Sequence, residues 1–274
     1  MAEETLGRLV APASVVERTM AYATLRPDPD AEPYYDEILL EIRPEGVATP
    51  AGSTSSSLAT YCTGDADLFE ALSTVDDAPL TAIFDIEEFT AWLRWVDDGS
   101  PIEVEFVGDA EAGIVGAFHL SNGAQTAVVD CYRDPLLLEE LTFELPSRFG
   151  DNDRFRLENG EPAPTVVETT AAAMERLAEA VALSPSVDRY PLVVEDGDLH
   201  VRLGRNGPTT VSGTLPGSVR SGPDVHNEYE EGFAAVFSCL SGELELQTGP
   251  DEPLVVVERG ADYTLRYVIM PVVW

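Results

Sequence analysis

The side chains that most often carry out catalysis are few in this sequence and lie far apart. The histidines are His119, His200 and His226. The cysteines are Cys62, Cys131 and Cys239. None of them falls into an H-x-x-x-H, C-x-x-C, G-x-S-x-G or P-loop pattern, so the sequence predicts neither a metal site nor a covalent nucleophile. The 50 acidic residues leave a glycosidase-type carboxylate pair open as an alternative. No motif favours it, and we predict a protein that is not an enzyme and holds no cofactor.

Arginine is the other residue type whose placement suggests a function. All 16 basic residues are arginines, and with 50 acidic residues they give a net charge of −34. Three arginines lie on predicted helices opposite the apolar face, namely Arg18, Arg94 and Arg176. Small residues such as Ala91 accompany them, so a phosphate backbone would be able to approach these faces closely. An ordinary solvated helix face is the competing interpretation, and the sequence leaves both open.

The acidic residues are scattered through every segment, which makes the charge a property of the whole surface. A lysine-poor acidic surface is typical of proteins that work in molar salt, where the Debye length falls to about 3 Å. An acidic mimic of nucleic acid or a cation-binding surface is the alternative. The dispersed cysteines predict reduced thiols without a disulfide framework. Because the chain has no basic-then-apolar leader and no apolar run of about 18 residues, we expect a soluble cytoplasmic protein.

The elements that carry these residues occur twice in the same order, which predicts two similar domains. Each half begins with a short strand and an amphipathic helix, continues with strands, inserts a second helix and closes with strands. The helices are predicted over residues 12–24, 85–96, 169–183 and 230–240, from apolar side chains at helical spacing. Residues 102–107, 114–120 and 125–132 are typical of hairpin-linked strands, with the Asn122-Gly123 turn before the last of them.

The composition changes between the two halves, which predicts a connector. The stretch 133–164 is rich in charged residues and contains four prolines, Pro135, Pro146, Pro162 and Pro164. We therefore predict an N-terminal domain over residues 1–133, a connector over 134–164 and a C-terminal domain over 165–274. The strands of the last region are predicted over 165–168, 192–195, 199–203, 209–215, 243–247, 253–258 and 264–270.

With this order of elements the chain resembles a DNA sliding clamp of the proliferating cell nuclear antigen (PCNA) family. The likeness is clearest over residues 230–274, EEGFAAVFSCLSGELELQTGPDEPLVVVERGADYTLRYVIMPVVW, which end in an apolar-Pro-apolar strand. Residues 8–23, 40–46, 85–134 and 213–223 are similar to further clamp segments in element order and apolar pattern. The resemblance implies an α+β fold of two clamp-type domains, each with antiparallel sheets outside and two helices inside, that assembles into a ring. The acidic surface suggests a divergent clamp from a halophilic archaeon or its virus.

The function that the resemblance implies is that of a processivity factor. Such a clamp encircles double-stranded DNA without sequence preference, forms a homotrimer and tethers DNA polymerase and other replication proteins. Arg18, Arg94 and Arg176 would contact DNA phosphates, since a clamp must slide and therefore avoids base-specific contacts. The alternative is an acidic, non-catalytic, protein-binding adaptor of the same fold that does not encircle DNA.

The resemblance also implies two protein interfaces. The subunit contact would pair the edge strand at 125–132 with the edge strand at 209–215 of the next subunit. Its residues would be Gln125, Ala127, Val129, Thr209, Val211 and Gly213. The pocket for client peptides would include Pro253, Val268, Met270 and Pro271, with Leu136, Leu137 or Phe149 added from the connector. Residues 51–59, AGSTSSSLA, depart from the Asp-containing apolar segment of the family, and the loop at 26–36 is extended.

Overall fold

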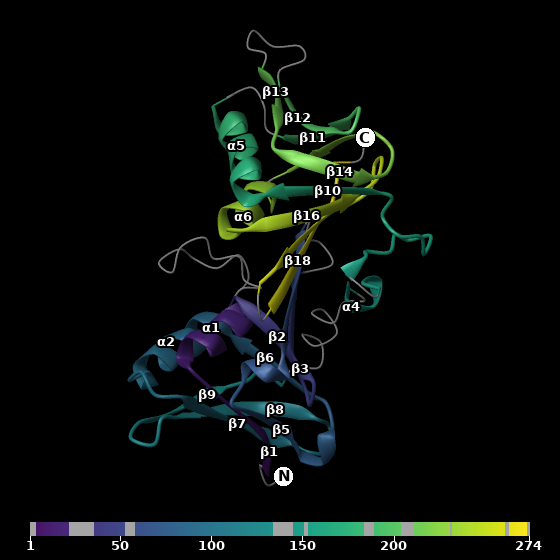
Figure 1. Cartoon of the computed structure of the whole chain (residues 1–274). Helices are drawn as coiled ribbons and strands as arrows, with labels where there is room; N and C mark the ends of the chain where they lie inside the picture. Colours follow the sequence, from purple (N-terminus) through teal and green to yellow (C-terminus); the bar gives the residue numbers. More distant parts are fainter. Residues whose placement is uncertain are drawn as a thin grey trace. The chain divides into compact units, whose positions relative to one another are not determined.

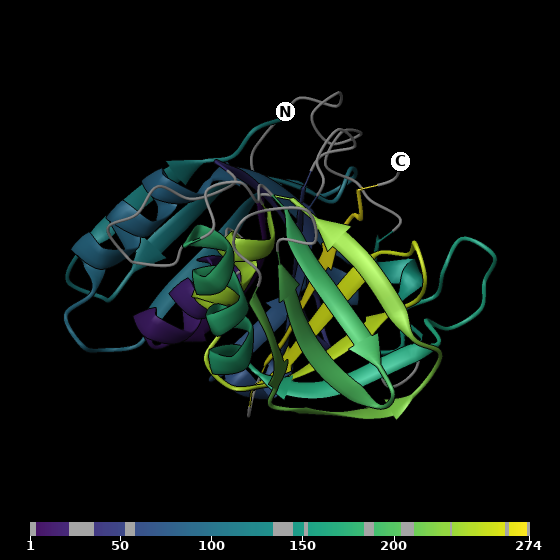
Figure 2. The same cartoon turned by 90° about the horizontal axis from the view of Figure 1, so that it is seen from above.

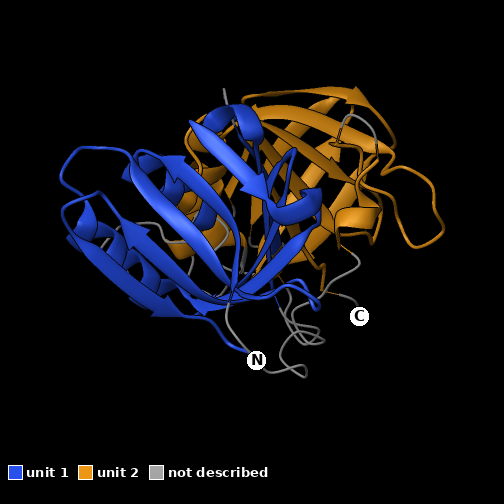
Figure 3. Cartoon of the chain, turned by 90° about the horizontal axis from the view of Figure 1, so that it is seen from below, with its two compact units in different colours: residues 1–54, 60–143, 260–265 blue, residues 55–59, 144–259, 266–274 orange. Residues whose placement is uncertain are grey.

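The computed structural model describes residues 4–21, 36–52, 58–133, 145–150, 153–183, 189–203, 211–230, 232–260 and 263–272. The chain divides into two compact units, drawn in blue and orange in Figure 3. Unit 1 comprises residues 1–54, 60–143 and 260–265, and unit 2 comprises residues 55–59, 144–259 and 266–274. Both units combine antiparallel strands with a pair of packed helices, and they repeat the same element order.

The strands of unit 1 form one path of neighbours with a side branch. They are β1 (Glu4–Ala11), β2 (Glu37–Arg43), β3 (Gly46–Gly52), β4 (Leu58–Asp65), β5 (Ala71–Thr74), β6 (Leu80–Asp85), β7 (Ile102–Asp109), β8 (Ile114–Ser121) and β9 (Thr126–Asp130). Their order is β4-β3-β2-β6-β8-β7-β1-β5, and β9 pairs with β8. The link between β6 and β8 is a single parallel bridge from Thr81 to Ile114. The strands β9-β8-β7-β1-β5 therefore form a continuous antiparallel sheet that has β9 at one edge.

Two helices of unit 1 pack side by side, α1 (Ala13–Ala21) and α2 (Ile86–Val96), as Figure 1 shows. The side chain of Asp85 begins α2, because its carboxylate accepts the Glu88 backbone N–H at 2.8 Å. Helix α2 buries one face, made of the apolar residues Ile86, Phe89, Leu93 and Val96 together with Thr90. Its Phe89 ring lies 5.3 Å from that of Phe118 on β8, so an aromatic cluster joins helix and sheet.

Unit 2 has the corresponding helices α5 (Ala171–Ala182) and α6 (Gly232–Cys239), which lie beside each other in Figure 2. Its strands are β10 (Thr165–Thr170), β11 (Tyr190–Glu195), β12 (Asp198–Leu203), β13 (Val211–Leu215), β14 (Gly217–Ser221), β15 (Val225–Tyr229), β16 (Glu243–Thr248), β17 (Leu254–Arg259) and β18 (Tyr263–Ile269). One row runs β14-β10-β16-β17-β18, and a separate sheet runs β13-β12-β11-β15. Strand β13 is therefore an edge of the second sheet.

A buried polar cluster holds β15 to the turn that precedes β17. The Asn227 side chain is 4% exposed and donates to the Gly249 and Glu252 carbonyl oxygens at 2.8 and 3.1 Å. Its Oδ1 accepts the Asp251 backbone N–H at 3.0 Å. The hydroxyl of Tyr229 belongs to the same cluster, and burial raises the pKa of Tyr229 to about 12. The cluster thus satisfies buried polar groups that the sheets leave unpaired.

The helices lie where the sequence predicted them, with shorter ends. The prediction of 85–96 becomes Ile86–Val96 with Asp85 as cap, and 169–183 becomes Ala171–Ala182 with Thr170 as cap. The hairpin at Asn122-Gly123 is also present, because Asn122 Oδ1 accepts the Gln125 backbone N–H at 2.7 Å and Gly123 has φ 86°. Strands β3, β5, β6, β14 and β15 had no counterpart among the predicted strands, since each is only four to seven residues long and lacks a regular alternation of apolar and polar residues.

Candidate nucleic-acid interface

The three predicted DNA-facing arginines lie on the exposed sides of α1, α2 and α5. Arg18 and Arg176 are exposed, and within the described part of the chain neither has an ion-pair partner. Arg94 differs, because its guanidinium lies 2.7 Å from the carboxylate of Glu17 on α1. The side chains of this pair are 48% and 34% exposed, so the contact is a surface ion pair. Arg94 therefore links the two helices, and its charge is already balanced.

The charge on the helices is negative overall. Helices α1, α2, α5 and α6 together carry three arginines and five glutamates, and α6 contributes neither type. The glutamates are Glu17, Glu87, Glu88, Glu175 and Glu179. Attraction to phosphates depends on the release of counterions by cationic side chains, and it weakens steeply with salt. These faces are thus able to contact a duplex at a few points, but they provide little electrostatic affinity.

The two strands predicted to join neighbouring subunits are both edge strands. Strand β9 pairs with β8 on one side, and β13 pairs with β12 on one side, so each leaves a row of backbone groups for a further strand. Gln125 lies in the turn before β9, and the side chains of Ala127 and Val129 are buried in the core of unit 1. Val211 is half-buried and Gly213 is exposed, whereas Thr209 lies outside the described residues. Any strand added at β9 would therefore bind the backbone and not the Ala127 or Val129 side chains.

The predicted client-peptide residues differ in accessibility. Val268 is 5% exposed, and its side chain belongs to the interior of β18. Pro253 and Pro271 are half-buried, and Pro271 forms a bridge with Tyr229 of β15. Met270 is 47% exposed, which makes it the most accessible of the four. Leu136 and Leu137 lie outside the described residues, and the ring of Phe149 packs under Arg266 at 5.4 Å.

Residues 145–163, within the predicted connector, fold onto the sheet of unit 2. They contain helix α4 (Leu145–Arg148) and two bridges, Phe149 with Phe155 and Arg156 with Pro162. The Gln247 side chain on β16 fastens this segment, accepting the Phe155 backbone N–H at 2.9 Å and donating to the Asp153 carbonyl oxygen at 2.8 Å. Gln247 is fully buried, so both bonds are shielded from water.

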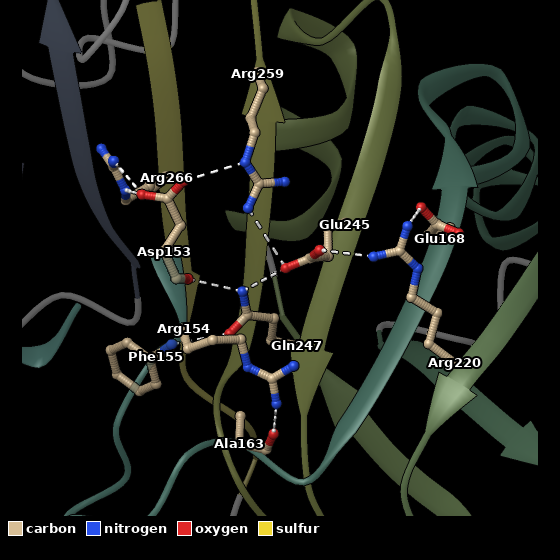
Figure 4. A network of polar contacts seen from close by, with 10 residues as sticks. All are labelled: Asp153, Arg154, Phe155, Ala163, Glu168, Arg220, Glu245, Gln247, Arg259 and Arg266. Carbon is tan, nitrogen blue, oxygen red and sulfur yellow. Dashed lines mark hydrogen bonds and ion pairs between the residues drawn. The ribbon is translucent and has the colours of Figure 1, made fainter. Parts of the chain in front are cut away.

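The same segment is held by charges that converge on Asp153 (Figure 4). Asp153 accepts from Arg266 Nε at 3.0 Å and from Arg259 Nε at 3.1 Å. Arg259 also approaches Glu245 at 3.6 Å, and Arg220 pairs with both Glu168 and Glu245. The partners are separated by more than 100 residues in the case of Asp153 and Arg266, so no local sequence pattern predicts this network. We refer to these side chains and Gln247 as the Asp153 network.

A groove of about 480 Å³ between β10, β14 and β16 is lined in part by the Asp153 network. Its charged lining residues are Glu168, Arg220, Glu243, Glu245 and Arg259. Three carboxylates therefore face two arginines that are already paired, which leaves no positive charge for a phosphate. The network stabilises unit 2, and we assign no nucleic-acid contact to it.

The residues that catalysis would use are dispersed in the structure as well. His119 is half-buried on β8, and His200 Nε2 lies 3.3 Å from the Glu195 carbonyl oxygen on the neighbouring strand. Burial raises the pKa of Cys131 to about 12 and that of Cys239 to about 11, so both thiols stay protonated and unreactive near neutral pH. Among the described residues, no three histidine, cysteine or acidic side chains converge as metal ligands would.

None of the helices in the described part of the chain has the length and apolar character that a membrane span requires.

Comparison with known proteins gives a likeness in structure alone. No protein-family model matches the sequence, and no curated protein matches it. Proliferating Cellular Nuclear Antigen from Entamoeba histolytica is 12% identical with a TM-score of 0.70, over 98% of this chain and 100% of that one. A. fulgidus PCNA with the C-terminal region of FEN-1 bound is 12% identical with a TM-score of 0.68, over 98% and 99%. PCNA from Thermococcus kodakaraensis is 15% identical with a TM-score of 0.67, over 97% and 100%. The α+β clamp fold of two similar domains, predicted from the sequence, is confirmed.

Proposed function

We propose that this chain is a DNA sliding clamp that encircles double-stranded DNA and tethers replication enzymes to it. The observation that carries the proposal is the likeness to three PCNA structures over 97–98% of this chain, at TM-scores of 0.67 to 0.70. A likeness that extends through both units favours a role that needs the entire clamp. The protein acts by topology and contributes no catalytic group.

The clamp closes as a head-to-tail homotrimer. The support for this is that β9 in unit 1 and β13 in unit 2 both lie at the edge of a sheet. A head-to-tail contact between different surfaces forms a closed ring when the rotation between subunits permits it. Strand β9 of one copy then pairs with β13 of the next, which removes both edges from solvent.

The clamp holds DNA mainly through ring closure. Arg18 and Arg176 contact phosphates, while five glutamates on α1, α2 and α5 oppose them. A net charge of −34 without lysine suits a cytoplasm of molar salt, as in a halophilic archaeon or its virus. At such salt, counterion release supplies little affinity. A closed ring remains on DNA without it.

Replication proteins bind near the end of the chain, at Pro253, Val268, Met270 and Pro271. The support is that one of the similar structures is a PCNA with the C-terminal region of FEN-1 bound. In this chain Met270 offers an accessible apolar side chain, whereas Val268 supports the strand from within. We expect a client peptide to contact Met270 first.

A protein-binding adaptor that does not encircle DNA is the second candidate function. The excess of glutamate over arginine on the helices favours it, since a DNA-lining surface normally carries net positive charge. The two functions predict different masses. Light scattering coupled to gel filtration in ~2–3 M KCl, where surface charges are screened, gives three chains for the clamp. A single chain at every concentration and salt would leave the adaptor as the function.

A further inference from the structure

Two tryptophans on α2 are exposed near β9, an edge strand of unit 1. Trp92 is 40% exposed and Trp95 is 51% exposed, and their rings meet edge to face with centroids 5.8 Å apart. Tryptophan is usually well buried in a folded chain and is enriched in protein interfaces. The core of unit 1 is complete without this pair, because the opposite side of α2 already packs against the sheet. The pair is therefore available for a partner.

The position of the pair on α2 points it away from α1. Arg94 marks the side of α2 that faces α1, since it pairs with Glu17 there. Trp92 precedes Arg94 by two residues, which places it about 160° away around the helix axis. Helix α2 itself packs on β8 and β9, whereas α1 packs on β3. Trp92 thus lies on the flank of α2 away from α1, on the side of the edge strand β9, and Trp95 lies beside it on the outward face of the helix.

The other face of the same edge is also apolar. Val128 on β9 is 56% exposed, and its side chain points to the opposite face of the sheet from the buried Ala127 and Val129. A strand that pairs with β9 would consequently have Val128 beside it on one face of the sheet. On the other face it would lie close to the tryptophans. This arrangement fits an added strand with a helix packed beside it.

The charge around the pair favours a protein over nucleic acid. Glu88 lies one helical turn before Trp92 and two turns before Trp95, so its carboxylate shares their face of α2. Glu87 is exposed at the same end. These carboxylates would repel the phosphates of a nucleic acid. Bases that stack on the tryptophans would bring their own phosphates close to the same carboxylates.

The same chain offers a matching surface in unit 2. Strand β13 is a free edge of five residues, as β9 is, and its Ser212, Gly213 and Thr214 are exposed. Helix α5 packs on β11 of that sheet, and the residue after it, Leu183, is 83% exposed. We propose that Trp92 and Trp95 are the apolar anchor between copies of this chain and that the end of α5 of the second copy, with Leu183, covers them. The proposal rests on the head-to-tail ring proposed above and names the side chains that hold it together.

The test uses full-length variants that each damage one half of the contact. The Trp92→Ala/Trp95→Ala variant damages the β9 side, and Leu183→Asp damages the α5 side. Each should weaken trimer formation by about 100-fold or more, as expected for interface anchors. Because the contact is head-to-tail, a mixture of the two variants retains one intact pairing. The mixture should give a mass of two chains at concentrations where each variant alone is a monomer.

Val75→Ala is the matched control, because Val75 is 48% exposed in the 3₁₀ turn η3 (Val75–Asp77), next to the opposite edge strand β5. This control should remain a trimer, and thermal unfolding should show all variants folded. If the wild type is a trimer and the tryptophan variant forms a trimer of equal stability, the inference is overturned, while the proposed ring still stands. The inference would also be overturned if the tryptophan variant stays trimeric but no longer binds DNA. That result would place the two tryptophans in the central channel of the ring, in contact with DNA. A monomeric wild type would refute the ring itself.

Discussion

Replacing Asp153 by asparagine tests how strongly the Asp153 network holds residues 145–163 on the sheet of unit 2. Asparagine keeps the size of the side chain and tolerates the left-handed backbone that Asp153 adopts, with φ 59°. The substitution therefore removes charge and changes little else. Its main partner, Arg266, has a side chain that is only 10% exposed.

The expected magnitude follows from burial. Removing one partner of a buried ion pair costs about 3–5 kcal/mol, whereas an exposed pair contributes about 0.2–1 kcal/mol. Asp153 is 20% exposed, and asparagine still accepts an N–H from Arg266, so the cost lies between these ranges. We expect about 2 kcal/mol, which corresponds to about 30-fold in the equilibrium for local opening.

Hydrogen exchange of backbone amides over residues 153–163 measures this opening directly. The rates there should rise about 30-fold in Asp153→Asn, and those of α2 in unit 1 should not change. Asp251→Asn is the matched control, because Asp251 has the same left-handed backbone, φ 60°, and no ion pair among the described residues. The reasoning is refuted if exchange is unchanged in Asp153→Asn, or if Asp251→Asn raises it equally.

Three further perturbations test other parts of the account. Changing Arg18 and Arg176 to glutamine should lower the slope of log DNA affinity against log salt by about 1 per lost phosphate contact, whereas Arg94→Gln should change it less because Glu17 already balances that charge. Asn227→Ala should lower the free energy of unfolding by about 2–4 kcal/mol in urea titrations, because it strands buried backbone groups. Since burial raises the pKa of Tyr229 to about 12, the unfolded chain loses this proton first as pH rises above its ordinary value of 10. Stability should fall by about 2–3 kcal/mol up to pH ~12, and Tyr229→Phe should remove that part of the slope.

Local patterns accounted for the helices and the central hairpin. The apolar spacing of Phe89 and Leu93, with Asp85 in front of it, specifies both the buried face and the start of α2. The Asn122-Gly123 pair specifies the turn before β9, because glycine adopts a positive φ there without strain. In each case the residues that determine the structure are neighbours in sequence, so the local sequence pattern is sufficient to predict it.

The parts that sequence did not predict depend on contacts between distant residues. Arg94 looks like a free cation on its helix, and only the packing of α1 beside α2 brings Glu17 to it. Arg259 and Arg266 look like ordinary strand residues until Asp153 folds back onto them. Trp92 and Trp95 fall outside the apolar stripe of α2, and this was the available signal that they face away from the core.

The central claim is that the protein encloses DNA as a ring, and topological retention tests it most directly. The protein is assembled from dissociated chains in the presence of a circular duplex, then washed in ~2 M KCl, which removes electrostatic binding. A ring remains on the circle through this wash and is released when a restriction enzyme linearises the DNA after return to low salt. Loss of the protein from the circle during the wash, or equal retention on circular and linear DNA, would contradict the claim.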